Sequence, residues 1–279
     1  MCLEGKSRFL LETYREHVLQ KRLLSAKNGT MKTAVITGAG SGIGQAIAYN
    51  LSASGHRIVI LDRSEEAGEA TAAQIKSDGG TAEVIACDVS STESVKAAFE
   101  KIDEVHVLIN NAGIASIGNV QDCDPEELDR VYNVNVKGVY LCLHYAIPKM
   151  LANGGGSIVN LASIASKIGI LDRFAYSMSK GAVFTMSLSI ARDYIDKGIR
   201  CNCVCPARVH TPFVDSYLEK NYDADKRPEM FKTLSEYQPI GRMGKPEEIA
   251  ELVGFLAPDK AGFITGSAYD IDGGVTLLR

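Results

Sequence analysis

Short apolar runs alternate with longer amphipathic stretches along the chain from Lys32 onward. The short runs are rich in Val and Ile, which is typical of strands buried on both faces of a sheet. They predict seven strands, at Thr33–Thr37, Arg57–Leu61, Glu83–Cys87, Val105–Ile109, Ser157–Leu161, Ile199–Cys205 and Ala268–Ile271. The intervening stretches predict helices near Ile43–Ser54, Glu65–Ser77, Ser94–Lys101, Pro125–Leu151, Phe174–Lys197 and Pro246–Leu256. This alternation indicates an α/β fold with a seven-stranded parallel sheet and helices on both faces.

Two segments fall outside the alternation. Residues 1–30 place apolar side chains at roughly helical spacing among mixed charges, and Met31 stands directly before the first strand. We therefore expect an N-terminal extension, helical or disordered, ahead of a single domain at residues 31–279. Residues 207–245 contain no obvious strand or long helix, and loops of that length are usually functional. We interpret them as a substrate lid.

The composition changes this picture only by excluding some partners. A hydrophobic content of 46% suits one large core, whereas a formal net charge of −4 with dispersed Lys and Arg residues gives no basic field for nucleic acid. No apolar run approaches the roughly 20 residues of a membrane helix, so we expect no membrane partner. Seven cysteines are an odd number, which favours a reducing, cytoplasmic compartment. Cys201, Cys203 and Cys205 alternate along one strand and are interpreted as packing residues, with no metal expected.

A glycine-rich turn, TGAGSGIG at residues 37–44, joins the first strand to the first helix. Such a turn lets backbone N–H groups approach a pyrophosphate at a helix N-terminus, as in a Rossmann-like doubly wound domain. Asp62 ends the second strand, where its carboxylate accepts hydrogen bonds from an adenosine ribose and repels a 2′-phosphate. Arg63 is the feature that would admit NADP, but no basic residue in the turn assists it. The sequence therefore favours NAD over NADP.

Two further short sequences stand at the carboxyl ends of predicted strands, the edge where ligands bind in open α/β sheets. Asp88-Val89 follows the third strand, and Asn110-Asn111-Ala112-Gly113 follows the fourth. Each alone is equally consistent with a turn. They support the cofactor site only in combination with the glycine-rich turn.

Tyr176 and Lys180 are four residues apart at the start of the helix after the fifth strand, and this spacing puts them on one helix face. A free tyrosine has a pKa of ~10, and an ammonium about 4 Å away contributes roughly the 4 kcal/mol needed to bring that pKa near neutrality. Tyr176 is therefore the candidate general acid/base. Ser163 follows the fifth strand and Asn135 lies inside a predicted helix; alone, each is equally a capping serine or a solvated asparagine.

Together, these motifs resemble the short-chain dehydrogenase/reductase (SDR) family from Met31 to the end of the chain. The family's glycine motif, D-V pair, N-N-A-G motif and catalytic tetrad match Thr37–Gly44, Asp88-Val89, Asn110–Gly113, and Asn135, Ser163, Tyr176 and Lys180. The resemblance implies hydride transfer between nicotinamide and a substrate carbon. Tyr176 would exchange the substrate hydroxyl proton and Ser163 would hold the reacting oxygen. Lys180 would also bind the nicotinamide ribose, and Asn135 would position a water that links Lys180 to a proton relay.

The resemblance extends to cofactor contacts and assembly. The expected cofactor residues are Gly38, Ser41, Gly42, Ile43, Gly44, Asp62, Arg63, Asp88, Val89, Asn111, Ala112, Gly113, Tyr176, Lys180, Pro206, Val209 and Thr211. One departure is Pro206-Ala207, where the family usually has Pro-Gly, which puts the local path of the loop in question. Ile271–Gly274 resembles a family ending that often packs at a subunit interface, so we expect a homotetramer or homodimer.

The substrate is the least determined feature. Ser163, Tyr176, Arg173, Arg208 and His210 are expected to bind it, and the cations among them favour a carboxylate, as in bacterial sugar and sugar-acid dehydrogenases. Solvated or intersubunit roles for the arginines have equal weight. We expect a small sugar or sugar acid, for example a 2-keto-3-deoxy sugar acid. A 3-oxoacyl-type carbonyl reductase and a non-catalytic NAD(H)-sensing protein are the alternatives.

Overall fold

The computed structural model describes residues 31–278. The extension predicted at residues 1–30 lies outside the described residues. None of the described helices is long and apolar enough to cross a membrane.

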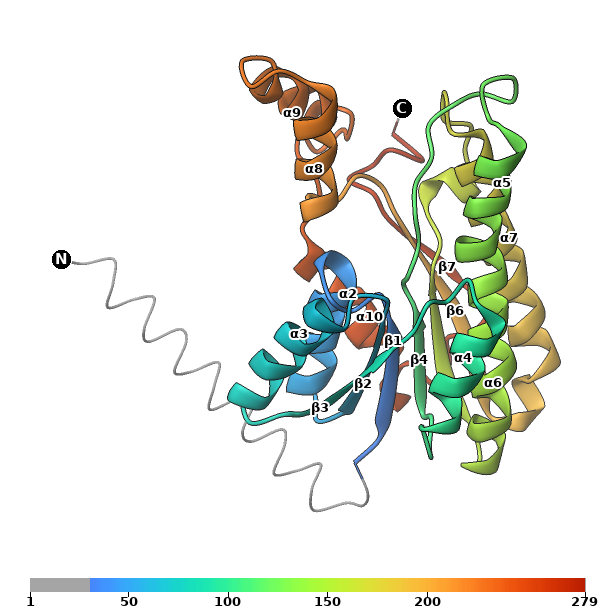
Figure 1. The fold of residues 1–279 in the computed structure, drawn as a ribbon. Coiled ribbons are helices and arrows are strands. Elements are labelled where there is room, and N and C mark those ends of the chain that lie inside the picture. Colours follow the sequence, from blue (N-terminus) through green and yellow to red (C-terminus); the bar gives the residue numbers. More distant parts are fainter. Residues whose placement is uncertain (1–30, 279) are drawn as a thin grey trace.

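Seven parallel strands form one sheet in the order β3-β2-β1-β4-β5-β6-β7 (Figure 1). The strands are β1 (Thr33–Thr37), β2 (Arg57–Asp62), β3 (Thr81–Ala86), β4 (Val107–Asn110), β5 (Gly156–Leu161), β6 (Ile199–Pro206) and β7 (Ala268–Ile271). All seven predicted strands are present, and the parallel, doubly wound α/β fold is confirmed. The strand order reverses at β1, whose neighbours are β2 and β4. In open α/β sheets, the crevice at this switch point is where nucleotides bind.

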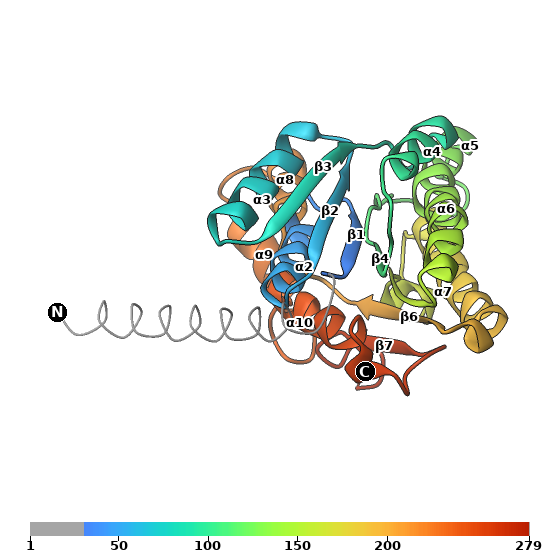
Figure 2. The ribbon, with the colours of Figure 1, turned by 90° about the horizontal axis from the view of Figure 1, so that it is seen from below.

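Helices cover both faces of the sheet (Figures 1 and 2). One face carries α2 (Gly42–Ala53), α3 (Glu65–Ser77) and α10 (Pro246–Leu256), and the other carries α4 (Thr92–Glu100), α5 (Pro125–Tyr132), α6 (Gly138–Ala152) and α7 (Phe174–Asp193). Each face has its own apolar cluster, because consecutive strand residues such as Val35 and Ile36 point to opposite faces. Two buried cores therefore fix the sheet that carries the loops at its carboxyl edge.

The long helix predicted at Pro125–Leu151 is not continuous. A π-helical turn at Asn133–Lys137 separates α5 from α6, so the backbone hydrogen bonds there skip one residue more than in an α-helix. The helix predicted to reach Lys197 also ends earlier, since α7 stops at Asp193 and a short 3₁₀ turn follows. The hydrophobic pattern predicted these helices but not the points at which they are interrupted or end.

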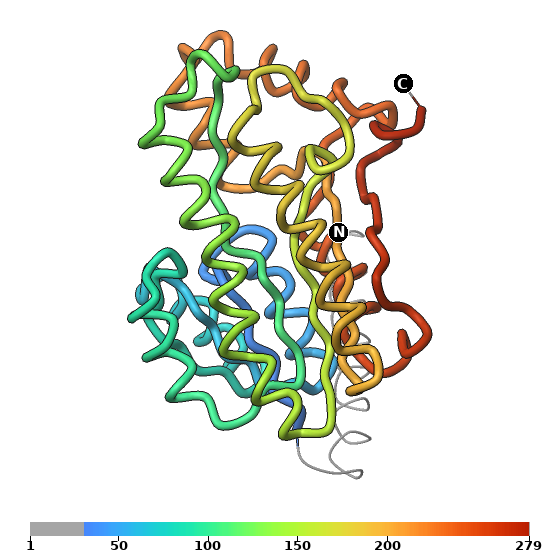
Figure 3. Tube along the Cα trace, turned by 90° about the vertical axis from the view of Figure 1, so that its right-hand side faces the viewer, coloured from blue at the N-terminus to red at the C-terminus, as the bar shows by residue number. Residues whose placement is uncertain are grey.

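The segment interpreted as a substrate lid, in which no long helix was obvious, contains two helices of ten residues each, α8 (Pro212–Asn221) and α9 (Arg227–Glu236). Both stand beyond the carboxyl ends of the strands, at the top of Figure 3. Leu218 is the only buried residue of α8, and α9 has none. Because almost no apolar stripe faces a core, the periodicity that reveals other helices is absent from this stretch.

Candidate active site

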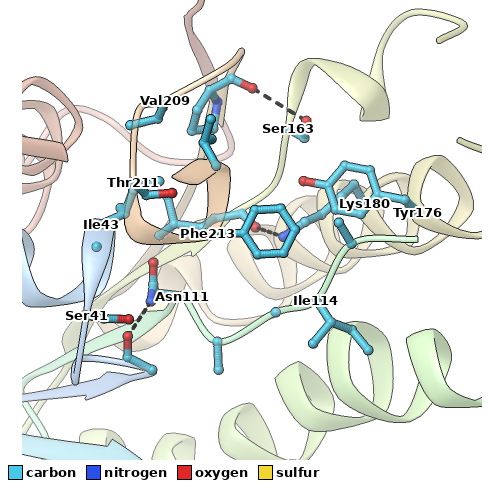
Figure 4. Close-up of a pocket in the computed structure, with 18 of the residues that line it drawn as sticks. Ser41, Ile43, Asn111, Ile114, Ser163, Tyr176, Lys180, Val209, Thr211 and Phe213 are labelled. Carbon is cyan, nitrogen blue, oxygen red and sulfur yellow. Dashed lines mark hydrogen bonds between the residues drawn. The ribbon is translucent and has the colours of Figure 1, made fainter. Parts of the chain in front are cut away.

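A cavity of about 640 Å³ lies at the carboxyl edge of the sheet, beneath α8. Residues from the turn after β1, the ends of β2 to β6, the start of α7 and both lid helices line it (Figure 4). A volume of this size is typical of small-molecule sites. Of the expected cofactor residues, the cavity is lined by Gly38, Ser41, Gly42, Ile43, Asp62, Arg63, Asp88, Val89, Asn111, Ala112, Gly113, Tyr176, Lys180, Pro206, Val209 and Thr211.

Gly44 is the expected cofactor residue that does not line the cavity. Its role in the structure is in packing. A Cβ at this position would lie 2.2 Å from the carbonyl oxygen of Gly38 and 2.4 Å from Asn111 Nδ2. Gly44 therefore lets the first turn of α2 close against the start of the glycine-rich turn. Gly38 and Gly42 have φ of 65° and 56°, a left-handed conformation that favours glycine.

Thr37 and Asn111 join the ends of β1 and β4 beneath the cavity. Thr37 Oγ1 accepts hydrogen bonds from the backbone N–H groups of Asn111 and Ala112, both at 3.0 Å. Asn111 Nδ2 in turn donates to the carbonyl oxygens of Thr37 and Gly38, at 3.0 and 2.9 Å. Asn111 thus fixes the glycine-rich turn, in addition to bordering the cavity.

Asp62 stands at the nucleotide end of the cavity. Its Oδ2 accepts a hydrogen bond from the backbone N–H of Gly40 at 2.8 Å, and its Oδ1 accepts one from Ser64 N–H at 2.9 Å. These bonds hold the carboxylate beside the glycine-rich turn and leave lone pairs on both oxygens for ribose hydroxyls. Together with the open N-terminus of α2, the donor set fits a nicotinamide adenine dinucleotide.

The catalytic side chains predicted from the sequence meet at one wall of the cavity. Tyr176 and Ser163 both line the cavity, and Ser163 is close enough to Tyr176 to influence its pKa. Lys180 lies one helical turn beyond Tyr176, with Nζ 5.8 Å from the centre of its ring. Lys180 Nζ donates to the carbonyl oxygen of Leu161 at 2.7 Å, which ties α7 to the end of β5. Figure 4 shows the three side chains on the same side of the cavity.

The electrostatics of Tyr176 differ from the expectation. Burial raises the pKa of Tyr176, and the opposing influences are the hydrogen bond with Ser163 and the charge of Arg173. Burial also lowers the pKa of Lys180 to about 8. The prediction that the Lys180 charge lowers the pKa of Tyr176 is wrong: desolvation outweighs nearby charge, and the charge that opposes this rise in pKa is that of Arg173.

Asn135 lies in the π-helical turn and is 1% exposed. Its amide exchanges two hydrogen bonds with the backbone of Ile114: Oδ1 accepts from N–H and Nδ2 donates to the carbonyl, both at 2.8 Å. Nδ2 also donates to Ser179 Oγ at 3.0 Å, and Ser179 Oγ donates to the carbonyl oxygen of Tyr176 at 2.7 Å. The Asn135 side chain thus braces the loop after β4 against the first turn of α7. Its expected role in positioning a water stays a prediction.

The expected substrate residues separate into two groups. Arg173 and Arg208 line the cavity together with Ser163 and Tyr176. Arg173 Nη1 donates to the carbonyl oxygen of Ser116 at 3.1 Å, and the Arg208 guanidinium lies over the ring of Tyr237, 4.7 Å from its centre. His210 does not line the cavity.

His210 contacts the lid helices instead. Its Nε2 is 2.8 Å from Asp215 Oδ1 in α8, and its ring meets Phe231 of α9 edge-on at 5.0 Å between centres. These contacts hold the His210 side chain against α8 and α9.

Sequence reasoning missed the apolar residues of the lid that line the cavity. They are Phe213, Val214 and Leu234, joined by the partly polar Tyr237. Phe213 lies between Thr211 and the Tyr176–Lys180 pair in Figure 4. The apolar pair directly after Pro212 is the signal in the sequence that could have indicated them. The departure at Ala207 is harmless, because Asp172 is the one non-glycine residue with positive φ among residues 31–278.

Comparison with known proteins assigns the chain to a protein family. The family model described as enoyl-(acyl carrier protein) reductase matches residues 38–276. The dehydrogenase/reductase SDR family member 6 of Aquarana catesbeiana is 36% identical over 247 residues, which cover 88% of this chain and 98% of that protein. The chain belongs to the short-chain dehydrogenase/reductase family.

Two further proteins extend the likeness to sequence and structure. An uncharacterised oxidoreductase of Thermotoga maritima is 42% identical over 249 residues, covering 88% of this chain and 98% of that protein. The solved aldohexose dehydrogenase of Thermoplasma acidophilum superposes with a TM-score of 0.80 at 35% identity, covering 88% of this chain and 94% of that one. This SDR chain is thus similar over its whole catalytic domain to dehydrogenases and oxidoreductases.

Proposed function

We propose that this SDR enzyme transfers a hydride between NAD and the secondary alcohol or ketone of a small polar substrate. The observation that carries the proposal is the meeting of Tyr176, Ser163 and Lys180 at one wall of a cavity whose opposite end holds the glycine-rich turn and Asp62. When bound, NAD supplies the acceptor for the hydride that leaves the substrate carbon.

The chain's own residues handle the substrate oxygen. Ser163 holds that oxygen beside the Tyr176 hydroxyl, and the phenol accepts or returns its proton as the carbonyl forms or is reduced. Arg173 favours the ionised form of Tyr176, since its charge opposes the rise in pKa that burial causes. Lys180, with a pKa of about 8, carries its proton near neutral pH and contributes a second positive charge to this wall.

The preference for NAD is proposed from Asp62. A 2′-phosphate would bring about two negative charges next to a carboxylate that Gly40 and Ser64 already hold in place. Arg63 also lines the cavity, but its charge acts on Asp88 and helps to lower the pKa of that carboxyl, after the larger effect of Ser90. We therefore expect Asp62 to dominate at the ribose.

A sugar or sugar acid is the proposed substrate class. The structural likeness to an aldohexose dehydrogenase supports a sugar-like substrate, and two arginines at the reacting end support an acid. The homotetramer or homodimer expected from the resemblance of Ile271–Gly274 to the family is also part of this proposal.

The decisive measurement is NADH formation against a panel of aldoses, aldonates, 2-keto-3-deoxy acids, simple alcohols and hydroxyacyl thioesters. Tyr176→Phe should abolish turnover while NADH still binds, as followed by its fluorescence. Asp62→Asn keeps the shape but removes the charge, so it should lower the preference for NAD over NADP by about tenfold or more. Binding of NADH without turnover of any compound would favour the sensing alternative. Turnover of thioesters alone would favour the acyl reductase.

A further inference from the structure

The substrate end of the cavity, defined here as its part beyond Tyr176 and Ser163, has an unusual chemical composition. Its walls are Ile164, Ile170, Ala207, Leu234 and Met243, with Phe213 at the side of the catalytic pair. Apart from the two reacting hydroxyls, the polar side chains there are Arg173, Arg208 and Tyr237. No acidic residue among residues 31–278 lines this end.

The two arginines give this end of the cavity a positive charge, and other residues hold both of them in place. Arg173 begins α7 and its Nη1 is held by Ser116. Arg208 is held by the Tyr237 ring, and its backbone carbonyl accepts a hydrogen bond from Gly244 at 2.9 Å. Two guanidinium groups that border one cavity favour a planar carboxylate, because their forked donors match its two oxygens.

The remaining walls disfavour additional hydroxyl groups. A sugar chain carries several hydroxyls, and each one buried against isoleucine, leucine or methionine loses its hydrogen bonds to water without a replacement. One such hydroxyl reduces kcat/KM by roughly 10- to 100-fold. Apolar walls instead favour methyl and methylene groups, which gain from burial.

We infer that the preferred substrate is a short-chain monohydroxy carboxylate: an acid with an aliphatic body, whose single hydroxyl is the one that reacts. The reacting carbon loses a hydride to NAD, and the hydroxyl proton passes to Tyr176, so the product is the corresponding keto acid. This inference rests on the proposed function. It keeps the NAD-linked hydride transfer and the carboxylate contact of that function, and it replaces the sugar-like body of the substrate with an aliphatic one.

The experiment compares four-carbon compounds that differ in one property at a time. NADH formation is measured with racemic 2- and 3-hydroxybutyrate, with the methyl ester of each, and with threonate and erythronate. The esters keep the body and remove the charge, whereas the two trihydroxy acids keep the charge and add hydroxyls. We expect the better hydroxybutyrate to exceed its ester and both trihydroxy acids by roughly 10- to 100-fold in kcat/KM.

Arg208→Gln tests the anion contact, with Arg130→Gln as the matched control. Arg130 is an exposed arginine of α5 that pairs with Glu127 and does not line the cavity. Arg208→Gln should reduce the preference for acid over ester at least tenfold, and Arg130→Gln should leave it unchanged.

The outcomes separate this inference from the proposed function. Turnover of threonate, erythronate or a hexose at or above that of both hydroxybutyrates would overturn the inference and leave the NAD-linked function standing. Equal turnover of acid and ester would do the same. Absence of NADH formation with every compound, including those of the wider panel, would overturn both.

Discussion

Ser179 and Ser177 lie two residues apart in α7, and the structure predicts opposite results for their replacement by alanine. Ser179 is fully buried and connects Asn135 to the first turn of the catalytic helix through two hydrogen bonds. The Ser177 hydroxyl is also buried, but it has no hydrogen-bond partner among residues 31–278. The pair therefore separates the effect of a hydrogen bond from the effect of a buried hydroxyl.

The magnitudes follow from which groups each change leaves unpaired. Ser179→Ala removes the acceptor of one Asn135 amide hydrogen in a site closed to water, and an orphaned buried donor costs about 1–3 kcal/mol. Ser177→Ala removes a hydroxyl that lacks a partner, so the free energy of unfolding should stay within about 0.5 kcal/mol or increase. Because Asn135 braces the loop beside Lys180, Ser179→Ala should also lower kcat about tenfold while KM for NAD changes little.

Urea denaturation of the cofactor-free variants, followed by circular dichroism, measures the first effect, and initial rates of NADH formation measure the second. If Ser179→Ala and Ser177→Ala changed the free energy of unfolding equally, the bracing role of Ser179 would be refuted. Full kcat in Ser179→Ala would show that the bond stabilises the fold without positioning the catalytic residues.

Two further predictions concern the cofactor turn and Lys180. Gly44→Ala places a methyl group 2.2 Å from the Gly38 carbonyl oxygen, so the glycine-rich turn must shift. Titration with NADH should therefore show at least tenfold weaker binding. Wild-type affinity for NADH would contradict this packing role of Gly44. Burial lowers the pKa of Lys180 from 10.5 to about 8, so the unfolded chain holds more protons between those values. The contribution of Lys180 to stability should therefore rise with pH across that window and be smallest below it. Urea titrations should show the stability advantage of Lys180→Met shrinking from pH 7.5 to 10, and a constant difference would contradict the low pKa.

Most strands could be predicted from the sequence because they bury both faces and read as nearly continuous apolar runs, as β1 and β4 do. Thr33–Thr37 and Ala268–Ile271 were predicted to the residue, whereas the start of β4 was placed two residues early because Val105 is apolar and buried without pairing. The π-helical turn left only an indirect mark, an asparagine inside an amphipathic helix. Its bond to Ile114 is a long-range contact that no local pattern encodes.

The positions of the site residues could be predicted from sequence motifs. Their pKa values and the directions of their side chains could not, because both depend on packing. The spacing of Tyr176 and Lys180 placed both at the cavity, but the distance between their charged atoms and the desolvation that governs their pKa values depend on packing. His210 and Arg208 are two residues apart in sequence, yet only Arg208 faces the cavity. Composition alone does not say which of two neighbouring cations points inward.

The scarcity of buried residues in α8 and α9 means that the lid has almost no core of its own. Phe213, Leu234 and Tyr237 face the cavity, so the bound substrate completes the apolar contacts that these helices lack. We therefore expect contacts with the substrate to stabilise α8 and α9. Substrates too short to reach Leu234 would lose these contacts, so we expect turnover to depend on the length of the substrate chain as well as on its charge.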